Sequence, residues 1–217
     1  MPVQLYFGLA AELLAIITGT YLLKKNQNRF LFLYIYVWIG FFAEISQPIL
    51  FFQFGIRNNL IIGHIFYPLE FLLLALMYSK ELGQFYKRQW LVLIIVVFML
   101  FAIINPMFLQ KLTEFSQLRS FTSIILVLFS ILYFYQVMMQ AKVKKLADDP
   151  MIWINVAILL YFALNLFYNI LFMYLLQISQ EFLRKSAFYF GLLNILFYLL
   201  IAVGFWKAVK QNKSTSL

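Results

Sequence analysis

The chain has 217 residues, of which 65% are hydrophobic and only 12% are charged. A soluble domain of this length would be about half apolar and a quarter charged, so the composition excludes an ordinary soluble protein and predicts a polytopic membrane protein. Cysteine is absent, which excludes disulfides, thiol nucleophiles and thiolate metal sites. The net charge of +9 comes from short basic loops between apolar stretches, a pattern typical of membrane topology signals and not of nucleic-acid binding.

Seven apolar stretches are long enough for a helix to cross the hydrocarbon core, which takes about 20 residues. The first stretch has no basic residue before it and is too long for the core of a signal peptide, so we expect it to be the first span. The expected spans are about 4–23, 30–54, 60–79, 90–110, 120–140, 151–177 and 186–206. Residues 207–217 are expected to form a short basic tail, with no soluble domain on either side. The sequence therefore predicts an all-α fold, a single seven-helix transmembrane bundle in residues 1–206.

Lys and Arg are distributed unequally between the two sides of this arrangement. The loops after the first, third and fifth spans and the tail contain Lys24, Lys25, Arg29, Lys80, Lys87, Arg88, Lys142, Lys144, Lys145, Lys207, Lys210 and Lys213. The opposite side contains only Arg57, Lys111, Arg119, Arg184 and Lys185. By the positive-inside rule, the amino terminus is outside the cell membrane and the carboxyl terminus is cytoplasmic. Trp90, Trp153 and Trp206 then lie at cytoplasmic ends of spans, where indole rings are common.

Three of the eight acidic residues fall inside the spans: Glu12, Glu44 and Glu70. On an insertion scale an aspartate at the helix centre costs roughly 2.5–3.5 kcal/mol, so these glutamates are expected to face the bundle interior or a wet cavity. The third span also contains the only histidine, His64, and Pro68 lies between His64 and Glu70. Because proline removes a backbone hydrogen bond, Pro68 is expected to bend this helix around such a cavity.

Helical spacing places further polar and small residues on shared faces. With a rise of ~1.5 Å per residue and the orientation above, these faces lie between the middle and the outer side of the membrane. We therefore predict a polar pocket that opens outward, above an apolar plug, with Arg57, Arg119 and Arg184 at its rim. The candidate ligand-binding residues are Glu12, Glu44, Gln47, His64, Glu70, Asn165, Asn169 and Asn194.

These residues also have structural interpretations. Glu12 and the three asparagines are of the kind that form hydrogen bonds between membrane helices, and His64 is a candidate for a similar role. The presence of only one histidine argues against a metal site, and the sequence has no HExxH, GxSxG or P-loop motif. We therefore predict neither catalysis nor a metal nor a cofactor. No lysine inside the spans is available for a retinal Schiff base.

Two stretches, HIFYPLEF at 64–71 and WINVAILLYFALNLFYNILF at 153–172, resemble small bacterial seven-helix membrane proteins found beside, or fused to, histidine kinases. The resemblance implies a sensory membrane module whose output lies in a separate kinase. It covers the hydropathy layout of most of the chain, but only these two stretches in detail. The chain departs from the fused forms because it has no kinase domain of its own.

The favoured functional interpretation is a receptor or sensor in the lipid bilayer. A small molecule, a lipid or a proton would reach Glu44, Glu70 and His64 from the outer side, and the cytoplasmic loops would signal to a histidine kinase or another membrane protein. A small-solute transporter, proton-coupled or not, is the first alternative, because buried carboxylates serve as proton relays and residues 1–79 and 120–206 share a faint similarity of layout that suits alternating access. A non-catalytic assembly subunit is the second. No nucleic-acid partner is expected.

Overall fold

The computed structural model describes residues 3–25, 28–55, 60–83, 85–109, 116–140, 146–178 and 180–215. These residues form helices and short turns, and no strand occurs among them. The seven α-helices are α1 (Val3–Leu23), α2 (Leu31–Phe54), α3 (Leu60–Leu82), α4 (Arg88–Ile104), α5 (Leu118–Gln140), α6 (Pro150–Ile178) and α7 (Gln180–Thr215). All seven are long and apolar enough to cross a membrane, which confirms the predicted all-helical fold with seven candidate membrane spans in the described residues.

Local sequence explains where several of these helices begin and end. Pro150 opens α6, where its missing N–H costs nothing, and the Asp149 carboxylate accepts a hydrogen bond from the Met151 N–H at 2.9 Å. Gly55 ends α2 in the left-handed conformation, with φ of 64°. The segment after Trp206 has no glycine or proline, so α7 continues to Thr215 and most of the expected tail is helical.

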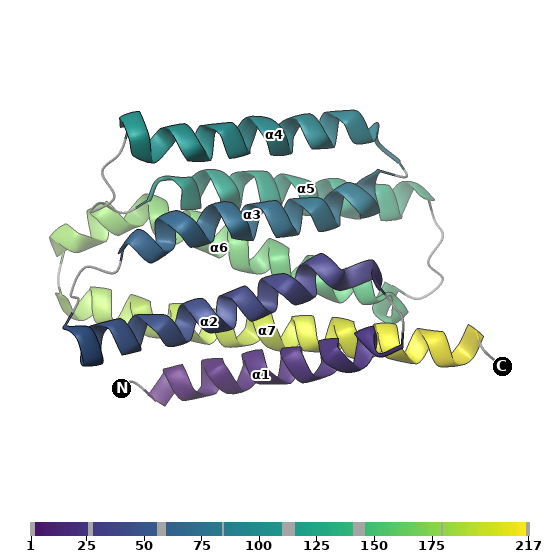
Figure 1. Ribbon diagram of the computed structural model, residues 1–217, viewed down its shortest axis with the longest axis horizontal. Coiled ribbons are helices and arrows are strands. Elements are labelled where there is room, and N and C mark those ends of the chain that lie inside the picture. Colours follow the sequence, from purple (N-terminus) through teal and green to yellow (C-terminus); the bar gives the residue numbers. More distant parts are fainter. Residues whose placement is uncertain are drawn as a thin grey trace.

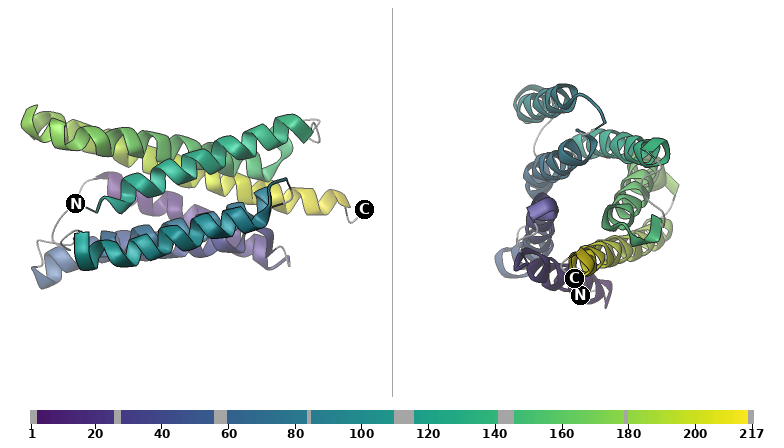
Figure 2. Two further views of the ribbon diagram at one scale, coloured as in Figure 1. Left: turned by 90° about the horizontal axis from the view of Figure 1, so that it is seen from above. Right: turned by 90° about the vertical axis from the view of Figure 1, so that its right-hand side faces the viewer.

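Six of the helices form a closed ring. Contacts run in the order α1, α2, α3, α5, α6, α7 and back to α1, so that α3 lies beside α5 and not only beside α4. The end-on view in Figure 2 shows this ring, and Figure 1 shows successive helices running in alternate directions. We call the end at which α1 begins the N end, and the opposite end, near the carboxyl terminus, the C end. Side chains that face the centre of the ring are enclosed by six helices.

Helix α4 lies outside the ring and packs against α3 (Figure 2). Its buried residues, Leu91, Ile95, Phe98 and Ala102, form one stripe at helical spacing. The Phe98 ring lies 3.9 Å from the Phe71 ring of α3, centroid to centroid. From Trp90 onward the remaining residues of α4 are apolar and mostly exposed, which fits contact with lipid. After Ile104 the backbone continues as a short π-helix, η2 (Asn105–Leu109), where Pro106 lacks the N–H that an α-helix needs.

Glycines allow some ring helices to approach closely. At Gly204 of α7, an added Cβ would lie 2.6 Å from Ile154 Cγ1 and 3.2 Å from the Pro150 carbonyl oxygen, both on α6. Small residues at such positions are the usual means of packing helices in lipid. At Gly191, also on α7, an added Cβ would make only ordinary contacts, at 3.5 Å from Gln4.

We predict that Gly204→Ala destabilises the protein by about 1–3 kcal/mol, because the new methyl group overpacks the α6–α7 contact. Gly191→Ala is the matched control on the same helix, and it should be neutral or mildly stabilising. Thermal unfolding of the purified variants in detergent, followed by circular dichroism, measures both changes. Equal melting temperatures for the two variants would contradict the close packing of α6 on α7.

Candidate functional site

A cavity of about 380 Å³ lies inside the ring, in the half nearer the N end. All six ring helices contribute described residues to its wall, and α4 contributes none. Its charged and amide residues are Glu12, Glu44, Gln47, Glu70, Arg119, Asn165 and Asn194. Its aromatic residues are Tyr36, Phe66, Tyr67, Tyr161, Phe162, Phe190 and Tyr198. A volume of this size lies within the ~300–1,000 Å³ that small-molecule sites commonly have.

Six of the eight residues predicted to bind a ligand line this cavity. They are Glu12, Glu44, Gln47, Glu70, Asn165 and Asn194, so the structure brings residues from α1, α2, α3, α6 and α7 together. His64 is buried but is not part of the wall. It precedes Glu70 by six residues, which turns it about 120° away around α3. Asn169 is half-buried one turn nearer the N end than Asn165, and it does not line the cavity either.

Glu44 lies in the corner between α1, α2 and α7. The Asn194 side-chain amide donates a hydrogen bond to Glu44 Oε2 at 3.3 Å. An added Cβ at Gly8 would lie 3.0 Å from Glu44 Oε1, so the absence of a side chain at Gly8 lets the carboxylate approach α1. Glu44 therefore joins three helices at one wall of the cavity.

Glu12, one helical turn after Gly8 on α1, is fully buried. Neither of its carboxylate oxygens has a hydrogen-bond partner in the part of the chain that the structure describes. Glu44 and Tyr198 lie close enough to act on it electrostatically. The Tyr198 hydroxyl itself packs against Gly40, where an added Cβ would lie only 2.5 Å away. Glu12 and Glu44 thus form a carboxylate pair at the α1–α2–α7 corner.

Arg119 of α5 faces this pair from the other side of the ring. Its guanidinium donates a hydrogen bond to Asn165 Oδ1 at 2.5 Å. It also lies over the rings of Tyr67 and Phe190, 5.5 and 5.7 Å from their centroids. The sequence predicted Arg119 at the rim, whereas the structure places it in the cavity wall because Asn165 and two rings hold its long side chain inside. Of the other two predicted rim residues, Arg57 and the Arg184 side chain lie outside the described part.

Glu70 of α3 is the carboxylate that interacts with Arg119. The two groups lie on the neighbouring helices α3 and α5 and attract each other electrostatically, and the Tyr36 hydroxyl donates a hydrogen bond to Glu70 Oε1 at 3.0 Å. The sequence analysis missed Tyr36. The signal for it was present, because Tyr36, Gly40 and Glu44 follow one another at four-residue intervals on one face of α2.

An apolar layer closes the cavity toward the C end. Each ring helix contributes a residue three or four positions, about one turn, beyond one of its cavity-lining residues. These residues are Ile16, Leu33, Leu74, Leu126, Ile158 and Ile201, and each is at most 5% exposed. Buried apolar residues are therefore present where the predicted plug would lie, about one turn beyond the cavity.

A polar layer follows beneath the apolar one, which the sequence analysis did not anticipate. The Tyr78 hydroxyl donates a hydrogen bond to Asn155 Oδ1 at 2.5 Å and lies 2.7 Å from Ser130 Oγ. The Asn155 amide donates to the Ser130 carbonyl oxygen at 3.1 Å. This layer joins α3, α5 and α6 with all three side chains buried.

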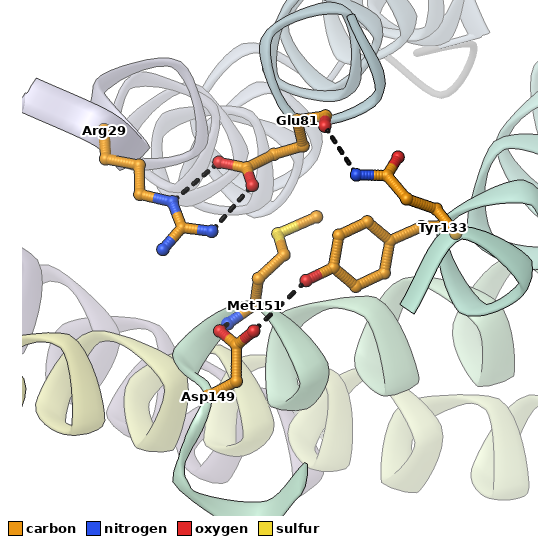
Figure 3. A network of polar contacts seen from close by, with 6 residues as sticks. Arg29, Glu81, Tyr133, Asp149 and Met151 are labelled. Atoms are coloured by element: carbon orange, nitrogen blue, oxygen red, sulfur yellow. Dashed lines mark hydrogen bonds and ion pairs between the residues drawn. The ribbon is translucent and has the colours of Figure 1, made fainter. Parts of the chain in front are cut away.

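A second polar network joins the helices at the C end (Figure 3). Arg29, just before α2, donates two hydrogen bonds to the Glu81 carboxylate of α3, at 2.7 and 2.6 Å. Gln136 of α5 donates to the Glu81 carbonyl oxygen at 3.3 Å. Tyr133 of α5 donates to the Asp149 carboxylate, which caps α6, at 3.4 Å. Helices α2, α3, α5 and α6 are thus connected at the C end by a network that the linear sequence did not reveal.

We predict that Arg119→Gln destabilises the protein by about 1–3 kcal/mol, because it removes the hydrogen bond to Asn165 and the positive charge that the described cavity wall offers to Glu70. Glu70→Gln in the same chain should restore part of this loss, giving a coupling of about 1–3 kcal/mol in a double-mutant cycle. Glutamine at position 70 keeps an acceptor for the Tyr36 hydroxyl. Chemical unfolding of the four proteins in mixed micelles measures the cycle. Strictly additive effects would contradict the Arg119–Glu70 interaction.

Comparisons with protein-family models, curated proteins and solved structures found no match to this chain. The resemblance to kinase-associated sensor proteins therefore stays a prediction. The functional argument rests on the cavity and on the layers that close it.

Proposed function

We propose that this chain is a membrane receptor or sensor that binds a small ligand in the cavity and signals to a separate protein. One observation carries the proposal: the cavity contains charged and amide side chains and lies in one half of the ring, and each ring helix contributes a buried apolar side chain about one turn beyond it. A binding site that is reachable from one side only suits detection of a ligand. Transport would also need an exit on the other side.

The unequal distribution of Lys and Arg supports an orientation with the N end outside. The cavity then faces the outside of the inner membrane, and the C-end network faces the cytoplasm. In this arrangement the partner binds at the basic cytoplasmic side. A histidine kinase, or another membrane protein, is the partner that the resemblance of residues 64–71 and 153–172 favours.

Helix α3 is the element best suited to transmit a change at the cavity. Glu70 contacts the cavity, Tyr78 belongs to the polar layer, and Glu81 pairs with Arg29 at the C end. Glu70 and Glu81 are eleven residues apart, which is about three helical turns, so they lie on nearly the same side of α3. A ligand that displaces Glu70 moves α3 as a rigid element. Tyr78 and Glu81 then exchange their hydrogen-bond partners, so that the bundle has two discrete states.

A transporter remains the alternative, and the three carboxylates around the cavity favour it. In that case the apolar layer is a closed gate, which opens in another state. An assembly subunit without a ligand is the third reading, in which the cavity is never reached from outside.

The absence of cysteine allows a direct test with single introduced cysteines and a thiol reagent that does not cross membranes. We predict that Ala43→Cys, in the cavity wall, reacts from outside the cell, and that Ser130→Cys, beyond the apolar layer, reacts from neither side. Gln117→Cys and Lys24→Cys, exposed near the N and C ends, serve as markers of the two sides.

The alternatives give different labelling patterns. Reaction of Ser130→Cys from the cytoplasmic side would support a gate and hence a transporter. An unreactive Ala43→Cys beside a labelled Gln117→Cys would contradict both a receptor and a transporter, and would leave an assembly subunit. Labelling of Lys24→Cys from outside would show that the orientation is the reverse.

A further inference from the structure

The charges around the cavity do not balance. Among the described residues of its wall, three are carboxylates and one, Arg119, is a cation. Arg119 acts electrostatically on Glu70 of the neighbouring helix α3. Glu12 and Glu44 interact with each other at the opposite corner, and no cationic side chain in the described wall offsets them. Carboxylates in a low-dielectric interior must be neutralised by a proton or by a bound cation.

The two carboxylates at this corner also have few hydrogen-bond donors around them. Both oxygens of Glu12 are buried and have no donor in the described part of the chain. Glu44 receives one hydrogen bond, from Asn194 at 3.3 Å. Among the described residues, these four carboxylate oxygens therefore have one direct hydrogen bond between them, and the Tyr198 hydroxyl is the one further donor that acts on Glu12. An ammonium group carries one positive charge and three N–H donors, so it supplies both the charge and the donors that the corner lacks.

The rest of the cavity is suited to an organic cation more than to a metal ion. Two carboxylates supply far fewer than the roughly six to eight oxygen ligands of a calcium site, and no group of three His, Asp or Glu residues that could hold a metal occurs in the described residues. A cavity of about 380 Å³ is much larger than an ion needs. Seven aromatic side chains line it, and such rings attract organic cations.

We infer that Glu12 and Glu44 bind the ammonium group of a small amine, whose carbon body lies among the aromatic side chains of the cavity. This inference rests on the proposed function, because the amine is the ligand that the receptor would detect. The fully buried Glu12 is the anchor, and Glu44, held by Asn194 and packed against Gly8, completes the site.

The test uses the full chain in lipid nanodiscs and a panel of amines at millimolar concentration: methylamine, butylamine, cyclohexylamine, phenethylamine and tyramine. Each amine is paired with the neutral alcohol of the same carbon skeleton, which has the same shape without the charge. We expect at least one amine to raise the melting temperature saturably while its alcohol does not. Isothermal titration then measures the affinity of that amine.

Charge-removing variants locate the site. We expect Glu12→Gln and Glu44→Gln, made separately, to weaken amine binding at least about thirtyfold, since each removes a buried charge partner. Asp148→Asn is the matched control, because it makes the same change at an exposed carboxylate near the C end, 65% exposed, and should leave the affinity unchanged. The melting temperature of each variant without amine shows whether it is folded.

Three results would overturn the inference: no amine in the panel binds, an alcohol binds as tightly as its amine, or both glutamine variants fold and bind the amine as well as the unmodified chain. None of these decides the proposed function, which depends on the labelling of Ala43→Cys. If Ala43→Cys reacts from outside while no amine binds, the receptor proposal stands and the ligand is of another chemical class.

Discussion

The cost of burying an uncompensated carboxylate in an apolar environment governs which face of each ring helix points toward the centre of the ring. Glu12, Glu44 and Glu70 come from three different helices, and all three line one cavity. The helix faces that carry them also carry glycines such as Gly8 and Gly40, which leave room for the Glu44 carboxylate and the Tyr198 hydroxyl. Large apolar side chains, among them Phe42, Leu164 and Leu192, are exposed on the ring helices. One electrostatic requirement thus accounts for the ring, its polar centre and its close contacts.

The ring is organised in layers along its axis, and the order of the layers gives the protein two unlike ends. The cavity is followed by six buried aliphatic side chains, then by the Tyr78–Ser130–Asn155 layer, then by the Arg29–Glu81 network. Helix α3 contributes to all four. Packed layers change between discrete arrangements and do not deform continuously. A shift of α3 can therefore transmit a structural change from one end of the bundle to the other.

Much of the cavity was predictable, and the exceptions have physical reasons. Glu44, Asn165 and Asn194 were placed correctly in the wall, because a polar residue in a span turns inward and helical spacing shows its neighbours. Arg119 was missed as a wall residue, since a long side chain near a helix end usually extends toward water and only Asn165 and two rings hold it inside. His64 was predicted in the wall and is not there, because it lies on another face of α3.

The sequence by itself determined the number of helices, their approximate bounds and six of the residues that line the cavity, because hydrophobic length and periodicity are local properties of a helix. Only the tertiary structure decided that α4 stands outside the ring, that α3 packs beside α5, and that Glu81 meets Arg29 and Tyr78 meets Asn155. Those contacts depend on the relative rotation and height of helices that are far apart in the chain. Such quantities follow from the packing of all the helices together, and no single span encodes them.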